Sequence, residues 1–297
     1  MVGTGVAFYE APAAMTQLPA HPALDDLPVG LDDLRRVVQG LLVHRDWAPL
    51  YDLSPDQVRL DEQNLRSTRE LLARAFELDD SPVTKPRPPI DRVLCICRHF
   101  ALLHVALLRA GGIPARMRCG FSNYFDRTKW YDHWITERWD AGDGTNGRWV
   151  RDDPQVDELQ ARTVSLDFDP YDQPAGKFLT GSEAWVATRN GELDPQLFGI
   201  FDMWGSAFIA GNVLSDLTCI NKVELLPWDA WGIGLRWGPH DQLDGDIVDL
   251  IDDVAALVNT DDLEAIRDRY DNDDRLTVPS RITTIAEGRP TDVTIDL

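Results

Sequence analysis

The chain has 297 residues, of which 43% are hydrophobic, enough for the core of one large domain or two modest ones. Its formal net charge is −21, from 50 acidic and 29 basic residues. Nucleic acid and anionic membranes bind clustered cations, so neither is an expected partner.

No apolar run reaches the length of about eighteen residues that a membrane-spanning helix needs. The opening MVGTGVAFYEAPAAM does not resemble a signal peptide. Four cysteines in so long a chain do not suggest a disulfide framework. We therefore expect a cytoplasmic protein.

The first hundred residues are predicted to be mainly helical. Apolar residues recur at helical spacing in 31–45 and 59–78, and the prolines of 81–89 predict a loop. A further helix is expected to begin near Cys97 and to end at Gly111-Gly112.

Alternating apolar and polar residues then predict three strands, at 113–121, 132–139 and 148–153. Later segments are predicted to be helices at 181–190, 201–220, 247–258 and 261–270, with an aromatic loop region at 224–238. Beyond about residue 240 the chain carries 16 acidic and 5 basic residues, over half of the net charge. We expect a main domain at 25–238 and an acidic C-terminal extension at 239–297.

Cys97 is the candidate nucleophile. At the start of a helix, the positive end of the helix dipole favours a thiolate, and an unpaired first-turn N–H can donate to an oxyanion. Cys95 lies in the apolar run Val93–Ile96, so we interpret it as a core residue.

His133 in YDHWITERW is the candidate base, and RWVRDDP supplies the carboxylates Asp152 and Asp153. The turn formers of DAGDGTN predict that the two strands form a hairpin. Centring the turn on Asp143 places His133 opposite Asp153 and turns Asp152 to the other face. A slip of one residue would exchange the two aspartates.

Three motifs in order, CRHFALLHVALLRAGGIPAR, DHWITERW and WVRDDP, resemble the transglutaminase-like domain of the papain-like cysteine enzymes. The resemblance covers about residues 95–154. It implies an α+β fold, with a nucleophile helix packed on an antiparallel sheet. It also implies Cys97 as nucleophile, His133 as base and Asp153 as orienting carboxylate. Trp149, four residues before Asp153, favours Asp153 over Asp152.

The expected chemistry is acyl transfer through a thioester on a small-molecule or peptide amide. Water would make the protein an amidase or peptidase, and an amine would make it an acyltransferase; the sequence leaves both open. The multidomain pattern of animal cross-linking enzymes is absent, which argues against protein cross-linking. The alternative is a catalytically silent binding or scaffold protein.

No cofactor is expected. A metal site built from Cys95, Cys97, His99 and Cys119 is disfavoured, because the C-x-C-x-H spacing is unlike that of structural zinc sites. His99 and His104 are interpreted as packing or exposed residues.

Two further sets of candidates surround this chemistry. A second oxyanion donor could be Gln39 or Trp47. Substrate-cleft candidates are Trp134, Asn221, Glu224 and Trp228, although aromatic clusters of this kind more often belong to the core.

Overall fold

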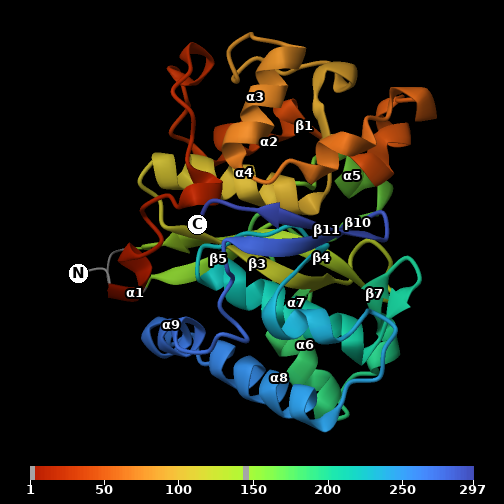
Figure 1. The fold of residues 1–297 in the computed structure, drawn as a ribbon. Coiled ribbons are helices and arrows are strands. Elements are labelled where there is room, and N and C mark those ends of the chain that lie inside the picture. The colour runs from red at the N-terminus through yellow and green to blue at the C-terminus, as the bar shows by residue number, and fades with distance from the viewer. Residues whose placement is uncertain (1–3, 143–146) are drawn as a thin grey trace. The chain divides into compact units, whose positions relative to one another are not determined.

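The computed structural model describes residues 4–142 and 147–297 (Figure 1). It mixes helices and strands, which confirms the expected α+β class. The chain divides into two units. Unit 1 comprises the residues up to Arg116 together with 135–161 and 170–172, and unit 2 comprises 117–134, 162–169 and 173–297.

Unit 1 is mainly helical around a short parallel strand pair. Its helices are α1 (Thr4–Ala7), α2 (Leu31–Leu41), α3 (Thr68–Leu78) and α4 (Cys97–Ala110), and the boundary with unit 2 falls inside α5 (Glu158–Thr163). Strands β1 (Leu42–His44) and β2 (Val93–Cys95) run parallel. Both α2 and α3 pack against α4.

Two of the predicted helices of this unit are shorter than expected. The helix predicted at 31–45 ends at Leu41, because the next residues form β1. Within 59–78 the helix α3 begins only at Thr68, after a 3-10 turn. Ser67 sets this start: its Oγ accepts from the Glu70 N–H at 3.1 Å, and the Glu70 carboxylate accepts from the Ser67 N–H at 2.8 Å.

The predicted hairpin is present as β4 (Trp130–Asp140) and β5 (Arg148–Asp152), but its predicted register is wrong by two residues. Thr136 lies opposite Asp152, so the ladder puts Ile135, and not His133, level with Asp153. The reason is that turn composition does not locate a turn's centre, and the turn residues 143–146 lie outside those described. A shift of two preserves the faces, so Asp152 and Asp153 still point to opposite sides.

Unit 2 contains a sheet in the order β6-β3-β4-β7-β8, to which β4 contributes its first half. The other strands are β3 (Ala115–Ser122), β6 (Phe178–Thr180), β7 (Phe198–Ile200) and β8 (Met203–Trp204). The helices of the unit are α6 (Gly181–Arg189), α7 (Ser206–Ile220), α8 (Gly245–Val258) and α9 (Leu263–Asp271). Helix α6 packs against both α7 and α8 (Figure 1).

The helix predicted at 201–220 begins five residues late. Phe201, in the turn between β7 and β8, and Gly205, directly after β8, have φ of 53° and 103°, which a right-handed helix does not allow. Helix α7 then starts at Ser206.

The end of the chain forms a hairpin that the sequence analysis missed. Strands β10 (Arg281–Ala286) and β11 (Arg289–Thr294) are antiparallel, and β10 also pairs with β9 (Asp229–Ala230). Residues 239–297 thus belong to unit 2, where the two predicted helices appear as α8 and α9. Among the described residues, no helix is long and apolar enough to cross a membrane.

Candidate active site

Cys97 is the first residue of α4, as predicted. Ile96 before it is extended, with φ −121° and ψ 171°, so the chain turns directly from strand into helix at the thiol. Cys97 is 7% exposed. An α-helix leaves its first-turn N–H groups without partners inside the helix, so the Cys97 N–H points along the axis at the positive end of the dipole.

Glu62 anchors the strand that leads into Cys97. Its Oε2 accepts from the Leu94 N–H at 2.7 Å, and its Oε1 lies 2.7 Å from both Arg59 Nε and Arg74 Nε. Because Glu62 is only 3% exposed, the negative charge of its carboxylate is compensated by these partners and hardly by water. This anchor was not predicted, because nothing in the sequence spacing of Glu62 links it to β2.

His99 stabilises the first turn of α4 from inside the protein. Burial, the main effect, lowers the pKa of His99 to about 3, so the ring is neutral. Nε2 lies 2.8 Å from the Leu65 carbonyl oxygen and must carry the proton that it donates there. Nδ1 then accepts from the Ile96 N–H at 3.5 Å. His99 is therefore a structural residue, in line with the packing interpretation.

Cys95 has the environment of a core residue. It is fully buried in β2, opposite His44 of β1. Burial raises the pKa of its thiol well above the usual value, which keeps it protonated. Of the two neighbouring cysteines, only Cys97 lies at a helix start.

His133 lies in β4 and is 2% exposed. Its imidazole is contacted edge-on by the rings of Tyr124 and Phe125, with centroid distances of 5.9 and 5.0 Å. These two aromatic residues, in the connection between β3 and β4, restrict the plane of the imidazole. They were not predicted as site residues, although the aromatic pair in NYFDR, shortly before the strand of His133, was a signal for them.

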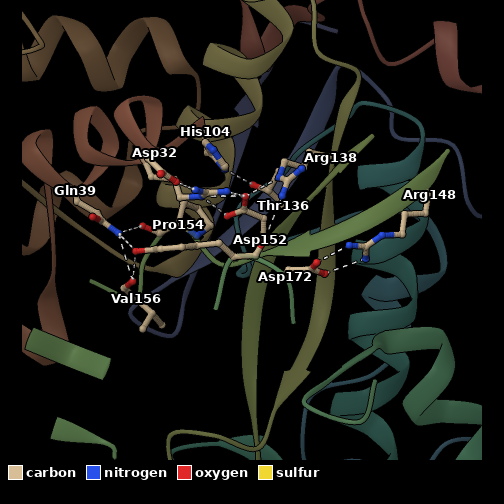
Figure 2. A network of polar contacts seen from close by, with 12 residues as sticks. Asp32, Gln39, His104, Thr136, Arg138, Arg148, Asp152, Pro154, Val156 and Asp172 are labelled. Carbon is tan, nitrogen blue, oxygen red and sulfur yellow. Dashed lines mark hydrogen bonds and ion pairs between the residues drawn. The ribbon is translucent and has the colours of Figure 1, made fainter. Parts of the chain in front are cut away.

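Asp152 forms ion pairs with two arginines (Figure 2). Arg35 places Nη2 2.7 Å and Nε 3.0 Å from the Asp152 carboxylate, and Arg138 places Nε 3.1 Å from it. Asp152 has no exposed surface. A carboxylate held by two guanidinium groups is fixed in position, so it serves the structure of unit 1.

Asp153 lies immediately after β5 and is also fully buried. Its backbone N–H donates to the Pro170 carbonyl oxygen at 2.9 Å, and its Oδ1 accepts from the Gln155 N–H at 3.0 Å. These two contacts fix the turn that carries the side chain, and neither of them is with an arginine. Asp153 therefore remains the candidate carboxylate.

The candidate oxyanion donors differ in their surroundings. The Gln39 amide donates to the Pro154 carbonyl oxygen at 3.1 Å, to that of Val156 at 3.4 Å and to the Tyr171 hydroxyl at 3.2 Å (Figure 2). Gln39 thus ties α2 to the segment that follows Asp153, and it would have to leave these acceptors to serve an oxyanion. Trp47 is half-buried in the 3-10 turn Arg45–Tyr51.

Two of the four cleft candidates are core residues. Trp134 and Glu224 are 1% and 0% exposed, so neither lies on an open surface. Asn221 and Trp228 are half-buried, and Asn221 Nδ2 donates to the Leu217 carbonyl oxygen at the end of α7. His104 is buried, with a pKa lowered to about 4 by burial, and its Nδ1 lies 3.2 Å from Thr136 Oγ1.

Metal binding has no candidate in the described part of the chain, where no three His, Cys, Asp or Glu side chains lie close enough to hold an ion.

Residues 62–154 match the family model of the transglutaminase-like superfamily. This transglutaminase-like region contains α3, α4, the β4–β5 hairpin and all three candidate residues. The match supports a cysteine-dependent enzyme. The matched residues include the whole of the segment, about 95–154, on which the sequence resemblance was based.

Among solved structures, the chain is similar to the crystal structure of a proposed cysteine protease from Cytophaga hutchinsonii. The two chains are 15% identical, with a TM-score of 0.24. The similarity covers 60% of this chain and 46% of the other, so it spans about half the length of that protein. No curated protein matches the chain.

Proposed function

We propose that the protein is a thiol-dependent acyl-transfer enzyme in which Cys97 is the nucleophile, His133 the base and Asp153 the orienting carboxylate. One observation carries the proposal: the transglutaminase-like region bears Cys97 as the first residue of α4, His133 on β4 and Asp153 directly after β5. The position of Cys97 is the one that favours a thiolate in a cysteine enzyme.

The reaction begins when His133 accepts the thiol proton and the Cys97 sulfur attacks the carbonyl carbon of an amide. The carbonyl oxygen becomes an oxyanion, which the Cys97 N–H and the helix dipole stabilise. The protonated His133 then donates its proton to the leaving amine as the C–N bond breaks. The product of this half-reaction is a thioester on Cys97 and a free amine.

The second half-reaction resolves the thioester. His133 takes a proton from water or from an amine, the new bond forms at the carbonyl carbon, and the Cys97 thiolate leaves. Water gives a carboxylic acid and net hydrolysis, whereas an amine gives a new amide. Asp153 accepts a hydrogen bond from the second ring nitrogen of His133 throughout, which fixes the tautomer.

Two environments support these assignments. Tyr124 and Phe125 contact the His133 ring edge-on, so its plane is restricted before substrate binds. The neighbouring Asp152 is held by Arg35 and Arg138, which leaves Asp153 as the aspartate for the histidine.

The decisive experiment is detection of an acyl-enzyme by intact-mass spectrometry. The protein is incubated with a panel of activated amides and esters and quenched in acid, and peptide mapping locates the adduct. We expect an acyl group on Cys97 in the wild type and none in Cys97→Ser. An adduct on another residue, or turnover in Cys97→Ser equal to that of the wild type, would contradict the proposal. Added hydroxylamine distinguishes hydrolysis from amine transfer, because a transferase forms the hydroxamate in preference to the carboxylic acid.

A further inference from the structure

Unit 2 contains a pocket of about 170 Å³ beside the loop between β3 and β4. It is lined by Asn123, Tyr124, Arg127, Ser165, Asp167 and Lys177, together with Val164 and Leu166. Typical small-ligand pockets enclose roughly 300–1,000 Å³. This pocket is smaller, so it suits one functional group of a larger substrate.

The charged groups of the pocket carry an excess of positive charge. Arg127 and Lys177 share a single carboxylate, with Asp167 3.7 Å from Arg127 Nη2 and 3.5 Å from Lys177 Nζ. Lys177 is one of only four lysines in a chain whose net charge is −21. Two cations facing one anion in so acidic a protein make this pocket a local attractor for anions.

The neighbouring groups of the pocket leave this excess in place. The Asp126 carboxylate accepts from the Thr128 N–H at 2.9 Å and from its hydroxyl at 2.7 Å, and Asp126 does not line the pocket. Arg127 also donates to the Ser165 carbonyl oxygen at 3.2 Å, which restricts the position of its guanidinium group. Lys177 is 33% exposed and lies 5.0 Å from the centroid of the Phe168 ring. Both cations are thus oriented and still accessible to a ligand.

Tyr124 connects this pocket to the candidate base. Its ring lines the pocket and also contacts the His133 imidazole edge-on, at a centroid distance of 5.9 Å. The Tyr124 hydroxyl accepts from Gln173 Nε2 at 3.4 Å, and the side chain is 5% exposed, so the ring is held in place. A group bound in the pocket would lie one aromatic ring away from His133.

We infer that this pocket is a subsite for a carboxylate of the substrate, bound by Arg127 and Lys177. The inference rests on the proposed function, because it places the subsite relative to His133. It narrows the substrate class to amides or peptides that carry a carboxylate near the reacting amide, such as an acidic side chain or a free C-terminus. Asp167 competes with that carboxylate for both cations and so limits its affinity.

The test is ligand-observed saturation-transfer NMR with the full chain, using glutarate as the probe and neutral glutaramide for comparison. Glutarate should bind and glutaramide should not. Arg127→Gln and Lys177→Gln should each weaken glutarate binding by about 3- to 10-fold, as expected for a charge-assisted contact at a partly exposed site. Asp167→Asn should strengthen binding by a similar factor, because it removes the competing carboxylate.

Arg281→Gln is the matched control, because Arg281 is an exposed arginine in an ion pair with Asp292 at 2.8 Å, outside the pocket lining. It should bind glutarate as the wild type does. Opposite effects at Asp167 and at the two cations cannot arise from general loss of structure. If one cation variant fails to fold, the other and Asp167→Asn still decide. Equal binding of glutarate by all variants, or none by the wild type, would overturn the subsite.

Cys97→Ser separates this inference from the proposed function, since it should abolish acylation but bind glutarate like the wild type. Acylation of Cys97 without any effect of Arg127→Gln on glutarate binding would leave the enzyme proposal standing and refute the subsite. Glutarate binding that follows the predicted order without acylation of Cys97 would leave a carboxylate-binding pocket and refute the enzyme.

Discussion

Arg35 and Asp152 form a buried ion pair, in which Arg35 Nη2 lies 2.7 Å from Asp152 Oδ2 and joins α2 to the end of β5. Arg35 is 4% exposed and Asp152 is 0% exposed, so neither charge has water to replace its partner. The pair fixes the strand end from which Asp153 emerges. It also gives the two adjacent aspartates separable roles.

Asp152→Asn should lower the free energy of unfolding by about 3 kcal/mol, because it leaves the buried Arg35 and the half-buried Arg138 with one negative charge fewer. The measurement is urea unfolding at neutral pH. Asp172→Asn is the control, since Asp172 pairs with Arg148 at an exposed position and should cost about 0–1 kcal/mol. Equal losses from the two variants would contradict the structural role of Asp152.

Asp153→Asn should reduce kcat/KM by roughly 10² to 10⁴, because the amide can present the wrong polarity to the imidazole. The thermal unfolding midpoint should change little, since the Gln155 N–H can still find an oxygen acceptor on the asparagine side chain. Rates of both aspartate variants are compared at a temperature where each is fully folded. A normal rate for Asp153→Asn would reduce the proposed triad to Cys97 and His133.

Limiting iodoacetamide at neutral pH should modify Cys97 before the other three cysteines. Cys97 is 7% exposed, whereas Cys95, Cys119 and Cys219 are 0–1% exposed. Burial also raises the pKa of Cys95, which removes its thiolate. Peptide mapping by mass spectrometry gives the order of labelling, and prior labelling of Cys95 would invalidate the assignment.

The free energy of unfolding should vary with pH because of Asp132, the residue before the candidate base. Burial of its carboxyl, opposed by His133 and by Asn212, raises the pKa of Asp132 to about 7. The folded state therefore binds this proton more tightly than the unfolded state, whose carboxyl titrates near 4. The contribution of Asp132 to the free energy of unfolding is fully present below about pH 4 and is lost as the pH rises to about 7.

Asp132→Asn should remove that loss, so the variant should gain stability relative to the wild type between pH 4 and pH 8. Urea unfolding across this range measures the difference. Asp126→Asn provides the opposite sign, because hydrogen bonds from Thr128 lower the pKa of Asp126. A wild-type slope that Asp132→Asn leaves unchanged would contradict the raised pKa.

Glu62→Gln should destabilise the protein by about 2 kcal/mol, since it weakens the contacts to Arg59, to Arg74 and to the Leu94 N–H. Glu77→Gln is a matched control that contacts the same Arg74 at 2.9 Å but is 67% exposed. Its expected cost is about 0–1 kcal/mol. Similar losses for both variants would show that Glu62 does not anchor β2.

Local patterns predicted the elements that carry the candidate residues. Helix α4, with Cys97 at its start and glycines at its end, follows from spacing and from the residues that stop helices. The β4–β5 hairpin follows from alternation and turn formers. The register needed information that turn composition does not contain, namely which residues pair across the strands.

Long-range partners could not be predicted in the same way. Arg35 and Asp152 are 117 residues apart, and Glu62 and Leu94 are 32 apart, so no local spacing joins them. Strands β10 and β11 were missed because most of their residues are polar, without the apolar alternation of a half-buried strand. The glycine of Glu287-Gly288 was the local sequence signal for this hairpin. In the structure both turn residues have positive φ, 53° and 72°.

The path of the chain through its two units has a consequence for inheritance. The boundary falls inside β3, inside β4 and inside α5, and the chain returns briefly to unit 1 at 170–172. No contiguous stretch of the gene therefore encodes either unit, and a single recombination point would split strands that each unit needs. Unlike modular domains, these two units therefore cannot be exchanged or duplicated one at a time as single gene segments.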